Sequence, residues 1–231
     1  MLSRNAFFAS CCLLCNGYVR GLKPLCAGCE SDFPWNQFAC LRCAMPMPAS
    51  AGLRICGACL QSPPLFEHAC CAWVYDDPVA GLLNRYKHSG QLACGYWLAQ
   101  GLADAVAAHY LQQKITLPDC LLPVPLHWKR LRNRGFDQAL EIAKVLSGRL
   151  DLPVSRSLQR QRFTDSQQSL DREQRQRNLA GAFALRKPLK SQCVALVDDV
   201  LTTGSTANEI TALLLSAGVD EVHLWAIART P

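Results

Sequence analysis

The sequence predicts an α/β protein, with a doubly wound, mostly parallel sheet and a small cysteine-rich module at the N-terminus. Three observations support this fold class. Apolar runs alternate with helical periodicity after residue 64, eight cysteines form C-x-x-C pairs in the first 60 residues, and a continuous apolar run at 194–197 is typical of a buried strand. The chain has 231 residues, half of them hydrophobic, which is enough for one α/β domain plus a small module and excludes a disordered protein.

Helices are predicted where apolar residues recur every three to four positions. Ser89 and Gly90 separate the first two helices, and Gly218 is a suitable C-cap for the last. The predicted helices span residues 79–87, 92–113, 136–150 and 205–217. Short apolar runs between the helices predict strands, and a long polar stretch predicts a loop. The strands span residues 120–124, 180–185, 194–197 and 222–228, and the loop spans 156–179.

Four C-x-x-C pairs dominate the first 60 residues. Each pair can form a thiolate knuckle, and two knuckles complete a tetrahedral Cys₄ zinc site. We therefore predict two structural Zn²⁺ ions. We expect the pairs to combine sequentially, the first with the second and the third with the fourth, rather than in an interleaved way. The predicted ligands are Cys12, Cys15, Cys26, Cys29, Cys40, Cys43, Cys56 and Cys59.

Other uses of these cysteines were weighed against zinc. Iron–sulfur ligation is an open alternative, because thiolates bind both metals. Disulfides need an oxidising compartment, which no export signal supports, and a thioredoxin-type redox pair explains one C-x-x-C but not four. Cys11 could replace Cys12, although only Cys12 has the two-residue spacer to Cys15. The six cysteines outside the pairs include five in apolar surroundings after residue 64, which we expect to be buried.

The metal module is predicted to span residues 1–64, and the α/β domain residues 65–231. Each part is expected to have its own core, and that of the module depends on zinc. Residues 8–11 look like a lipoprotein cleavage box, but the apolar segment before them is too short for a signal peptide. No apolar stretch is long enough to span a bilayer. We therefore expect a cytoplasmic protein with no membrane partner.

Two adjacent carboxylates and a hydroxyl-rich loop follow the apolar run at 194–197. Asp198 and Asp199 lie at the carboxyl end of the predicted strand, where open α/β sheets bind ligands. Residues 202–206 can present backbone N–H groups at a helix N-terminus, which favours an anion. A sugar phosphate matches both features. The alternative, solvated carboxylates before an N-capping Thr or Ser, explains the hydroxyls but not the adjacent acids. The sequence contains no P-loop and no dinucleotide-binding motif.

This stretch resembles the 5-phosphoribosyl-1-pyrophosphate (PRPP) motif of type I phosphoribosyltransferases. The resemblance implies that Asp198 and Asp199 are the catalytic pair and accept hydrogen bonds from the ribose 2′ and 3′ hydroxyls. It also implies a loop that cradles the 5′-phosphate. That loop consists of Thr202, Thr203, Gly204, Ser205 and Thr206. Mg²⁺ is expected with PRPP, bridging pyrophosphate and ribose oxygens.

Basic residues gather between positions 129 and 178. This segment holds twelve Lys and Arg against six Asp and Glu, a surplus equal to the net charge of +6 of the whole chain. Arg guanidinium groups match pyrophosphate and phosphate-backbone oxygens well. The predicted contacts are Arg130, Arg134, Arg172 and Arg175. Residues 160–178 are numerous enough to form a closing lid. A solvated basic face is the alternative.

These features together resemble the competence protein F (ComF) family, whose members join a double zinc ribbon to a phosphoribosyltransferase-like domain. The resemblance covers nearly the whole chain. It rests on the paired cysteines, residues 86–90, 123–126, 134–138 and 167–178, and the PRPP motif. The family commonly has other residues at His88, Gly90-Gln91 and Asp137, so the resemblance assigns no role to positions 88, 91 and 137. It implies a link to the uptake or reuse of external DNA.

Two functions follow as hypotheses. The first is transfer of phosphoribosyl from PRPP to a nucleobase-like acceptor, whose pocket we expect from residues 66–113 or from the zinc module. The second is a non-catalytic protein that binds single-stranded DNA or a nucleotide along residues 129–178. Residues 1–70 carry five Lys and Arg and three Asp and Glu, and eight thiolates on two Zn²⁺ make the module negative. We therefore expect it to contact DNA-processing proteins rather than phosphate.

Overall fold

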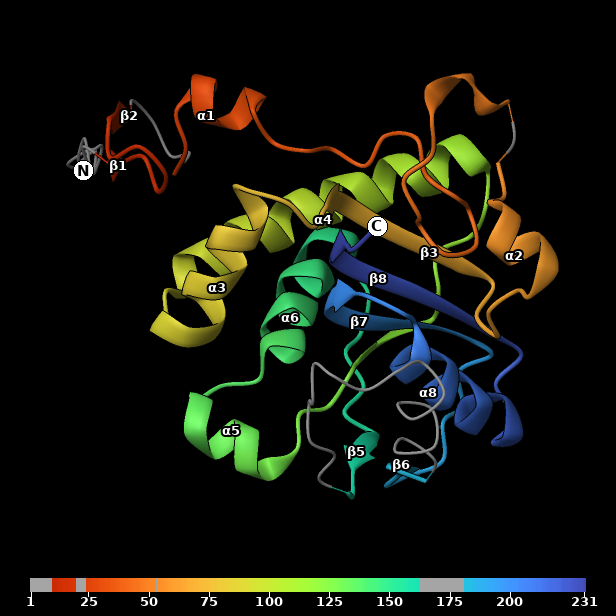
Figure 1. The fold of residues 1–231 in the computed structure, drawn as a ribbon. Helices are drawn as coiled ribbons and strands as arrows, with labels where there is room; N and C mark the ends of the chain where they lie inside the picture. The colour runs from red at the N-terminus through yellow and green to blue at the C-terminus, as the bar shows by residue number, and fades with distance from the viewer. Residues whose placement is uncertain (1–9, 20–23, 53, 163–180) are drawn as a thin grey trace, which may run out of the picture.

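The computed structural model describes residues 10–19, 24–52, 54–162 and 181–231. Its centre is a sheet of four parallel strands in the order β3–β8–β7–β4 (Figure 1). The strands are β3 (His68–Val74), β4 (Cys120–Pro123), β7 (Cys193–Leu201) and β8 (Glu221–Arg229). A parallel bridge between Leu121 and Val154 extends the sheet beyond β4. The predicted doubly wound parallel sheet is therefore confirmed.

Strand β7 is longer than its apolar run predicted. The four residues 194–197 are fully buried, as expected for a central strand covered on both faces. Pairing with β4 ends at Val197, whereas pairing with β8 continues to Leu201. The carboxyl end of β7, beyond Val197, therefore has a strand neighbour on one side only.

Helices cover both faces of the sheet. On one face lie α3 (Val79–Ser89), α4 (Leu92–Gln113) and α6 (Gln138–Leu150), which share one apolar cluster with the inward side chains of that face. On the other lies α8 (Ser205–Ser216), which packs in a second cluster. Gly90 ends α3 with a φ of 63°, a left-handed conformation that glycine adopts without strain. The predicted break between the first two helices is confirmed.

After residue 64, four elements differ most from the prediction. These are β3, the short helix α5 (Trp128–Arg134), β5 (Leu158–Arg160) and β6 (Phe183–Leu185), which begins later than the predicted strand at 180–185. Strands β5 and β6 pair antiparallel as a separate ribbon. The segment 163–180, which includes most of the predicted lid together with Arg172 and Arg175, lies outside the described residues.

The N-terminal module divides into two halves. The first contains β1 (Ser10–Cys11), β2 (Tyr18–Val19) and α1 (Ala27–Ser31), and the second contains the 3₁₀ helix η1 (Ala49–Ala51) and α2 (Gly57–Gln61). Figure 1 shows the halves apart, joined by an extended segment that runs past α4.

The expectation of separate cores was wrong for the first half. The buried side chains of Val19, Leu25 and Phe33 belong to the same apolar cluster as α3 and α4. This half has too few apolar residues to form a core of its own. Its apolar side chains therefore pack against the larger domain. The boundary near residue 64 stays a prediction. Within the described ranges, no helix combines the length and apolar character needed to cross a bilayer.

Candidate metal centres and phosphate site

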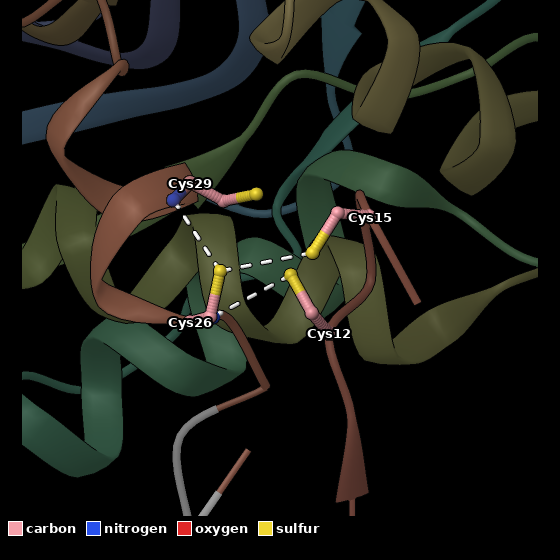
Figure 2. Close-up of side chains that lie close together, drawn as sticks. All are labelled: Cys12, Cys15, Cys26 and Cys29. Carbon is pink, nitrogen blue, oxygen red and sulfur yellow. Dashed lines mark hydrogen bonds between the residues drawn. The ribbon is translucent and has the colours of Figure 1, made fainter. Parts of the chain in front are cut away.

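The first and second cysteine pairs come together in one cluster. Figure 2 shows the side chains of Cys12, Cys15, Cys26 and Cys29 around a shared space, and their sulfurs lie within 4.8 Å of one another. Cys15 Sγ and Cys26 Sγ are 3.7 Å apart. Two sulfurs on a tetrahedral zinc with bonds of about 2.3 Å would be about 3.8 Å apart. The cluster therefore has nearly the spacing of an assembled Cys₄ site.

The third and fourth pairs form an equivalent cluster. The sulfurs of Cys40, Cys43, Cys56 and Cys59 also lie within 4.8 Å of one another. Cys43 Sγ and Cys56 Sγ are 3.6 Å apart, and the Cys56 amide donates to Cys40 Sγ at 3.2 Å. The corresponding bond in the first cluster runs from the Cys26 amide to Cys12 Sγ. The sequential grouping of the pairs is confirmed, and Cys11 is not part of either group.

The electrostatics of the clusters favour a bound cation. Burial raises the pKa of the Cys12 thiol, but three backbone N–H groups outweigh it and hold this pKa at about 6. In the second cluster, burial and the charge of Cys40 raise the pKa of Cys43 to about 11. Several thiolates cannot share so small a volume unless a metal ion neutralises them. The donor set, four sulfurs with no other ligand type, fits Zn²⁺.

The strand order locates a second site at the carboxyl edge of the sheet. After β4 the chain turns outward through α6 to the segment at Val154, and after β7 it turns the opposite way through α8 to β8. The two directions diverge between β4 and β7, and open α/β sheets bind ligands at such a switch point. The residues that follow these strands are α5 on one side and the 202–204 loop on the other.

The loop after β7 is built to receive an anion. Gly204 has a φ of 76°, and an added Cβ would have its nearest neighbours at 3.8 Å, so backbone conformation rather than crowding favours glycine here. The first helical hydrogen bond of α8 runs from the Asn208 amide to the Gly204 carbonyl. The three amides before it have no carbonyl within the helix to donate to, and that of Ser205 donates to the Thr203 hydroxyl at 3.3 Å. The Thr203 and Ser205 hydroxyls, 2.9 Å apart, are hydrogen-bonded beside them.

Asp198 and the predicted phosphate loop belong to one pocket. Asp198 and all five loop residues, 202–206, line a small cavity of about 50 Å³ at the start of α8. The structure thus brings together six of the seven residues predicted to bind PRPP.

Asp199, the seventh, lies on the opposite side of β7, as alternation along a strand requires. Its carboxylate is 3.0 Å from the ammonium group of Lys87 in α3. The side chains of Lys87 and Asp199 are 19% and 16% exposed, so solvent screens this ion pair only partly. The sequence placed Lys87 in a family block but gave it no role.

Asp198 is held in an unfavourable environment for a carboxylate. Burial raises its pKa from an ordinary 3.8 to about 7, and the adjacent Asp199 charge adds to the rise. The Asp199 amide, which donates to Asp198 Oδ1 at 2.8 Å, and the Lys87 charge oppose it without reversing it. Carboxyl groups with such raised pKa values are common at binding and catalytic sites.

Two guanidinium groups interact electrostatically with the two carboxylates. Burial lowers the pKa of Arg134, and the nearby Asp199 carboxylate opposes this shift. Burial also lowers the pKa of Arg160. The positive charge of Arg130 lowers it further, and the Asp198 carboxylate opposes this shift. The predicted Arg134 therefore interacts with Asp199, and Arg160 in β5, to which no motif pointed, interacts with Asp198; the predicted Arg130 lies near both of these arginines.

Arg229 connects the phosphate loop to the second cysteine cluster. Its guanidinium donates to the Cys43 carbonyl at 2.9 Å, to the Leu201 carbonyl at 3.1 Å and to the Thr202 carbonyl at 2.6 Å. The side chain is 7% exposed. A cavity of about 630 Å³ lies beside this connection, bordered by the cluster, by Phe66 and by residues 201–204. No sequence motif predicted this contact, because Arg229 is the last residue of a strand of ordinary composition.

With this geometry known, comparisons with other proteins become informative. Competence protein F of Haemophilus influenzae is 35% identical over 231 residues, which cover 96% of this chain and 98% of that protein. The chain belongs to the competence protein F family. DNA utilization protein YhgH of Escherichia coli K12 is 33% identical over 221 residues, 95% of this chain and 96% of the relative. Competence protein ComFC of Streptococcus pneumoniae is 24% identical over 207 residues, 89% and 87% of the two chains.

Solved structures show a weaker likeness to this family member. The glutamine PRPP amidotransferase of B. subtilis aligns with a TM-score of 0.36 and 20% identity, over 56% of this chain and 25% of the other. A purine phosphoribosyltransferase of Pyrococcus horikoshii gives 0.36 and 17%, over 58% and 84%. Scores this low carry no argument, so the fold class rests on the strand order described above. No family model matches the chain.

Proposed function

We propose that the chain binds PRPP or a related ribose phosphate at the carboxyl edge of its sheet. The observation that carries this proposal is the pocket shared by Asp198 and residues 202–206 at the N-terminus of α8. The loop amides and hydroxyls receive the 5′-phosphate. The two carboxylates accept hydrogen bonds from the ribose hydroxyls, and Arg130 and Arg134 face the pyrophosphate.

The residues also fit an accompanying Mg²⁺. Asp198 and Asp199 are the hard oxygen ligands that this ion prefers, and bound Mg²⁺ would neutralise part of the pyrophosphate charge. The protein's own residues orient the sugar and stabilise the departing pyrophosphate by charge, which is how such sites favour transfer of a phosphoribosyl group. The large cavity beside Phe66 and Thr202 has a volume typical of small-molecule sites, about 630 Å³. We assign the nucleobase-like acceptor to this cavity.

Isothermal titration calorimetry with PRPP, with and without Mg²⁺, tests the binding site. Asp199→Ala removes a hydroxyl acceptor, and Gly204→Val forces a β-branched residue into a left-handed conformation. Each is expected to weaken binding about tenfold or more, since one hydrogen bond to a charged group contributes roughly 1.5–3 kcal/mol. Asp220→Asn, an exposed exchange in the turn before β8, is the control. Equal PRPP affinity in all variants would place the site elsewhere. A pyrophosphate-release screen over nucleobases then tests turnover.

The family relatives connect this site to DNA. The names competence protein F and DNA utilization protein support a role in the uptake or use of external DNA. Cytoplasmic localisation is part of the proposal, supported by fourteen cysteines that are all free. The zinc module exposes Tyr18 by 63%, Phe38 by 56% and Leu60 by 64%, which favours contact with a DNA-processing protein.

A second function, binding of single-stranded DNA, is favoured by helix α5. Trp128 is 56% exposed, and the charged groups of Lys129 and Arg132 lie 5.8 Å and 5.7 Å from its ring. An exposed aromatic ring among cations is the arrangement on which bases stack in single-stranded DNA complexes.

Fluorescence anisotropy with an oligonucleotide tests this function. Trp128→Ala is expected to lower affinity by about tenfold, given roughly 1–3 kcal/mol for one stacked base. Tyr96→Ala, another exposed aromatic residue at 57%, is the matched control. Arg132→Ala is expected to reduce the log–log salt slope by about 0.7. If Trp128→Ala and Tyr96→Ala bind DNA alike, α5 is a solvated surface.

A further inference from the structure

The amino edge of the sheet, opposite the phosphate site, holds a third group of metal-binding side chains. His68 begins β3, Glu221 and His223 begin β8, and Cys193 begins β7. None of these residues belongs to the cysteine clusters or to the proposed phosphate site.

Strand register explains why these four residues converge. His68 pairs with His223 across β3 and β8, and Cys193 pairs with Glu221 across β7 and β8. Glu221 and His223 are two positions apart on one strand, so they project from the same face of the sheet. The four side chains therefore form a block on the face that α4 covers.

The distances within this block suit a metal ion. The ligand atoms of His68, Glu221 and His223 all lie within 4.8 Å of one another. Glu221 Oε1 is 2.7 Å from His223 Nε2 and 3.9 Å from His68 Nε2, and Cys193 Sγ is 3.8 Å from His223 Nε2. Two nitrogen or oxygen ligands on a tetrahedral zinc are about 3.4 Å apart. Small shifts of Glu221 would thus complete the geometry.

Hydrogen bonding by itself does not account for the block. Nδ1 of His68 is buried and has no hydrogen-bond partner among the described residues. The ring of His223, by contrast, is held in place by a hydrogen bond between its Nδ1 and the Tyr110 hydroxyl. The same hydroxyl accepts the Trp225 indole N–H at 2.9 Å. A histidine ligand usually binds the metal through one ring nitrogen while the other is held by a hydrogen-bond partner, and the Tyr110 hydroxyl is such a partner for His223 Nδ1.

We propose that His68, Glu221 and His223 bind a divalent transition-metal ion of the zinc class, with Cys193 as a fourth ligand. Two imidazoles and a carboxylate are a donor set for Zn²⁺ and its neighbours Co²⁺ and Ni²⁺, not for Mg²⁺ or Ca²⁺. Glu221 is 42% exposed and His68 27%, so the ion has a path from solvent. A bound metal ion would link β3 to β7 and β8 at the amino edge of the sheet, where the chain enters the sheet from the N-terminal module.

Cobalt titration of the protein with both cysteine clusters already filled with zinc tests the proposal. Zinc holds the thiolate sites against cobalt, so added Co²⁺ reports only on a further site. The expected result is one additional equivalent with visible d–d absorption, and a rise in melting temperature on Co²⁺ addition. If Cys193 is the fourth ligand, the spectrum also contains a sulfur-to-cobalt charge-transfer band, and this band disappears in Cys193→Ser. If the wild-type spectrum lacks the charge-transfer band, the ion has only the three ligands His68, Glu221 and His223.

Variants at the exposed side of the block make the test specific. His68→Gln and Glu221→Gln are each expected to lower Co²⁺ affinity by about tenfold or more, since even second-shell partners of metal ligands have effects of that size. His88→Gln, an exposed histidine at the end of α3, is the matched control and retains wild-type Co²⁺ binding. Circular dichroism verifies that each variant is folded. No Co²⁺ bound beyond the two clusters, or equal binding in all three variants, would overturn the proposal and leave the block as a hydrogen-bonded core.

Discussion

Replacing Asp198 with asparagine is expected to stabilise the protein above neutral pH while abolishing its ligand binding. Asp198 is a partly buried carboxyl beside a second carboxylate, and its pKa is raised to about 7 from 3.8. The folded protein therefore holds this proton more tightly than the unfolded chain does. As a result, the free energy of unfolding falls as pH rises from about 4 to about 7, and the full loss is present above pH 7.

The size of the effect follows from the two pKa values. Each unit corresponds to about 1.36 kcal/mol, so the ionised carboxylate destabilises the fold by up to about 4 kcal/mol above pH 7. Between pH 5.5 and pH 8 the loss amounts to about 2 kcal/mol. Asparagine has nearly the same shape and does not ionise. For a chain of this length, about 2 kcal/mol corresponds to roughly 4–8 °C in melting temperature.

Thermal unfolding of the wild type and Asp198→Asn across this pH range measures the difference. The melting-temperature advantage of the variant should grow with pH, and other titrating groups, including the cysteines, cancel because both proteins share them. Asp220→Asn controls for a general effect of removing a negative charge. Added PRPP should raise the melting temperature of the wild type but not that of Asp198→Asn. An advantage that does not change with pH, or a variant less stable than the wild type at pH 8, would refute the reasoning.

Three further predictions concern the neighbouring groups. Lys87→Met leaves the half-buried Asp199 without its partner and should lower the free energy of unfolding, measured in urea, by a few kcal/mol. The control Lys144→Met breaks an exposed pair with Glu141 and should change this free energy by less than about 1 kcal/mol. Arg229→Lys cannot span the three carbonyls of its partners and should weaken PRPP binding several-fold with unchanged zinc content; equal affinity would show that the loop needs no brace. Metal analysis of anaerobically purified protein should find two tightly held zinc ions per chain, and a visible cluster absorbance or less than one zinc would contradict both cysteine sites.

Helices and central strands were predictable because their signals are local. The helix predicted at 92–113 has the same bounds as α4, since Gly90 ends the preceding helix and apolar residues continue through the next. The strand at 194–197 was found because four fully buried residues form an uninterrupted apolar run. For both elements, the apolar pattern in the sequence matches the burial of the residues in the structure from one end of the element to the other.

Strand β3 was missed for a physical reason. Its sequence, His68–Val74, contains alanines and cysteines in place of most β-branched residues, and apolar periodicity cannot distinguish so short a buried strand from a helix. It forms one edge of the sheet, where the N-terminal module bonds to it through the Asn36 amide and the Ala72 carbonyl. This contact covers an edge that would otherwise be exposed. Helix α5 was missed because seven mostly basic residues show no apolar face; in the structure it ends at Gly135, which has a φ of 80°.

The two contacts that organise the phosphate site were beyond prediction. Lys87 and Asp199 come from α3 and β7, and Arg229 and Cys43 are 186 residues apart. Nothing local in a single sequence specifies such pairings. The motif identified the residues that we propose to bind a ribose phosphate, but not the cations that contact them.

Arg229 couples the second cysteine cluster energetically to the loop of the proposed phosphate site. Its guanidinium is almost fully buried, and such a group is tolerated only when carbonyls satisfy its N–H donors. One of these carbonyls belongs to Cys43 in a metal knuckle, and two belong to Leu201 and Thr202 at the start of the phosphate loop. Loss of the metal would release the knuckle, so the loop would lose the anchor that fixes its first carbonyls. Because coupling between two sites is reciprocal, a phosphate ligand on the loop must raise the equilibrium affinity for the metal by the same factor by which the metal strengthens ligand binding. The zinc module is therefore not an appendage of the sheet domain: its second half sets the position of the loop that the motif identifies.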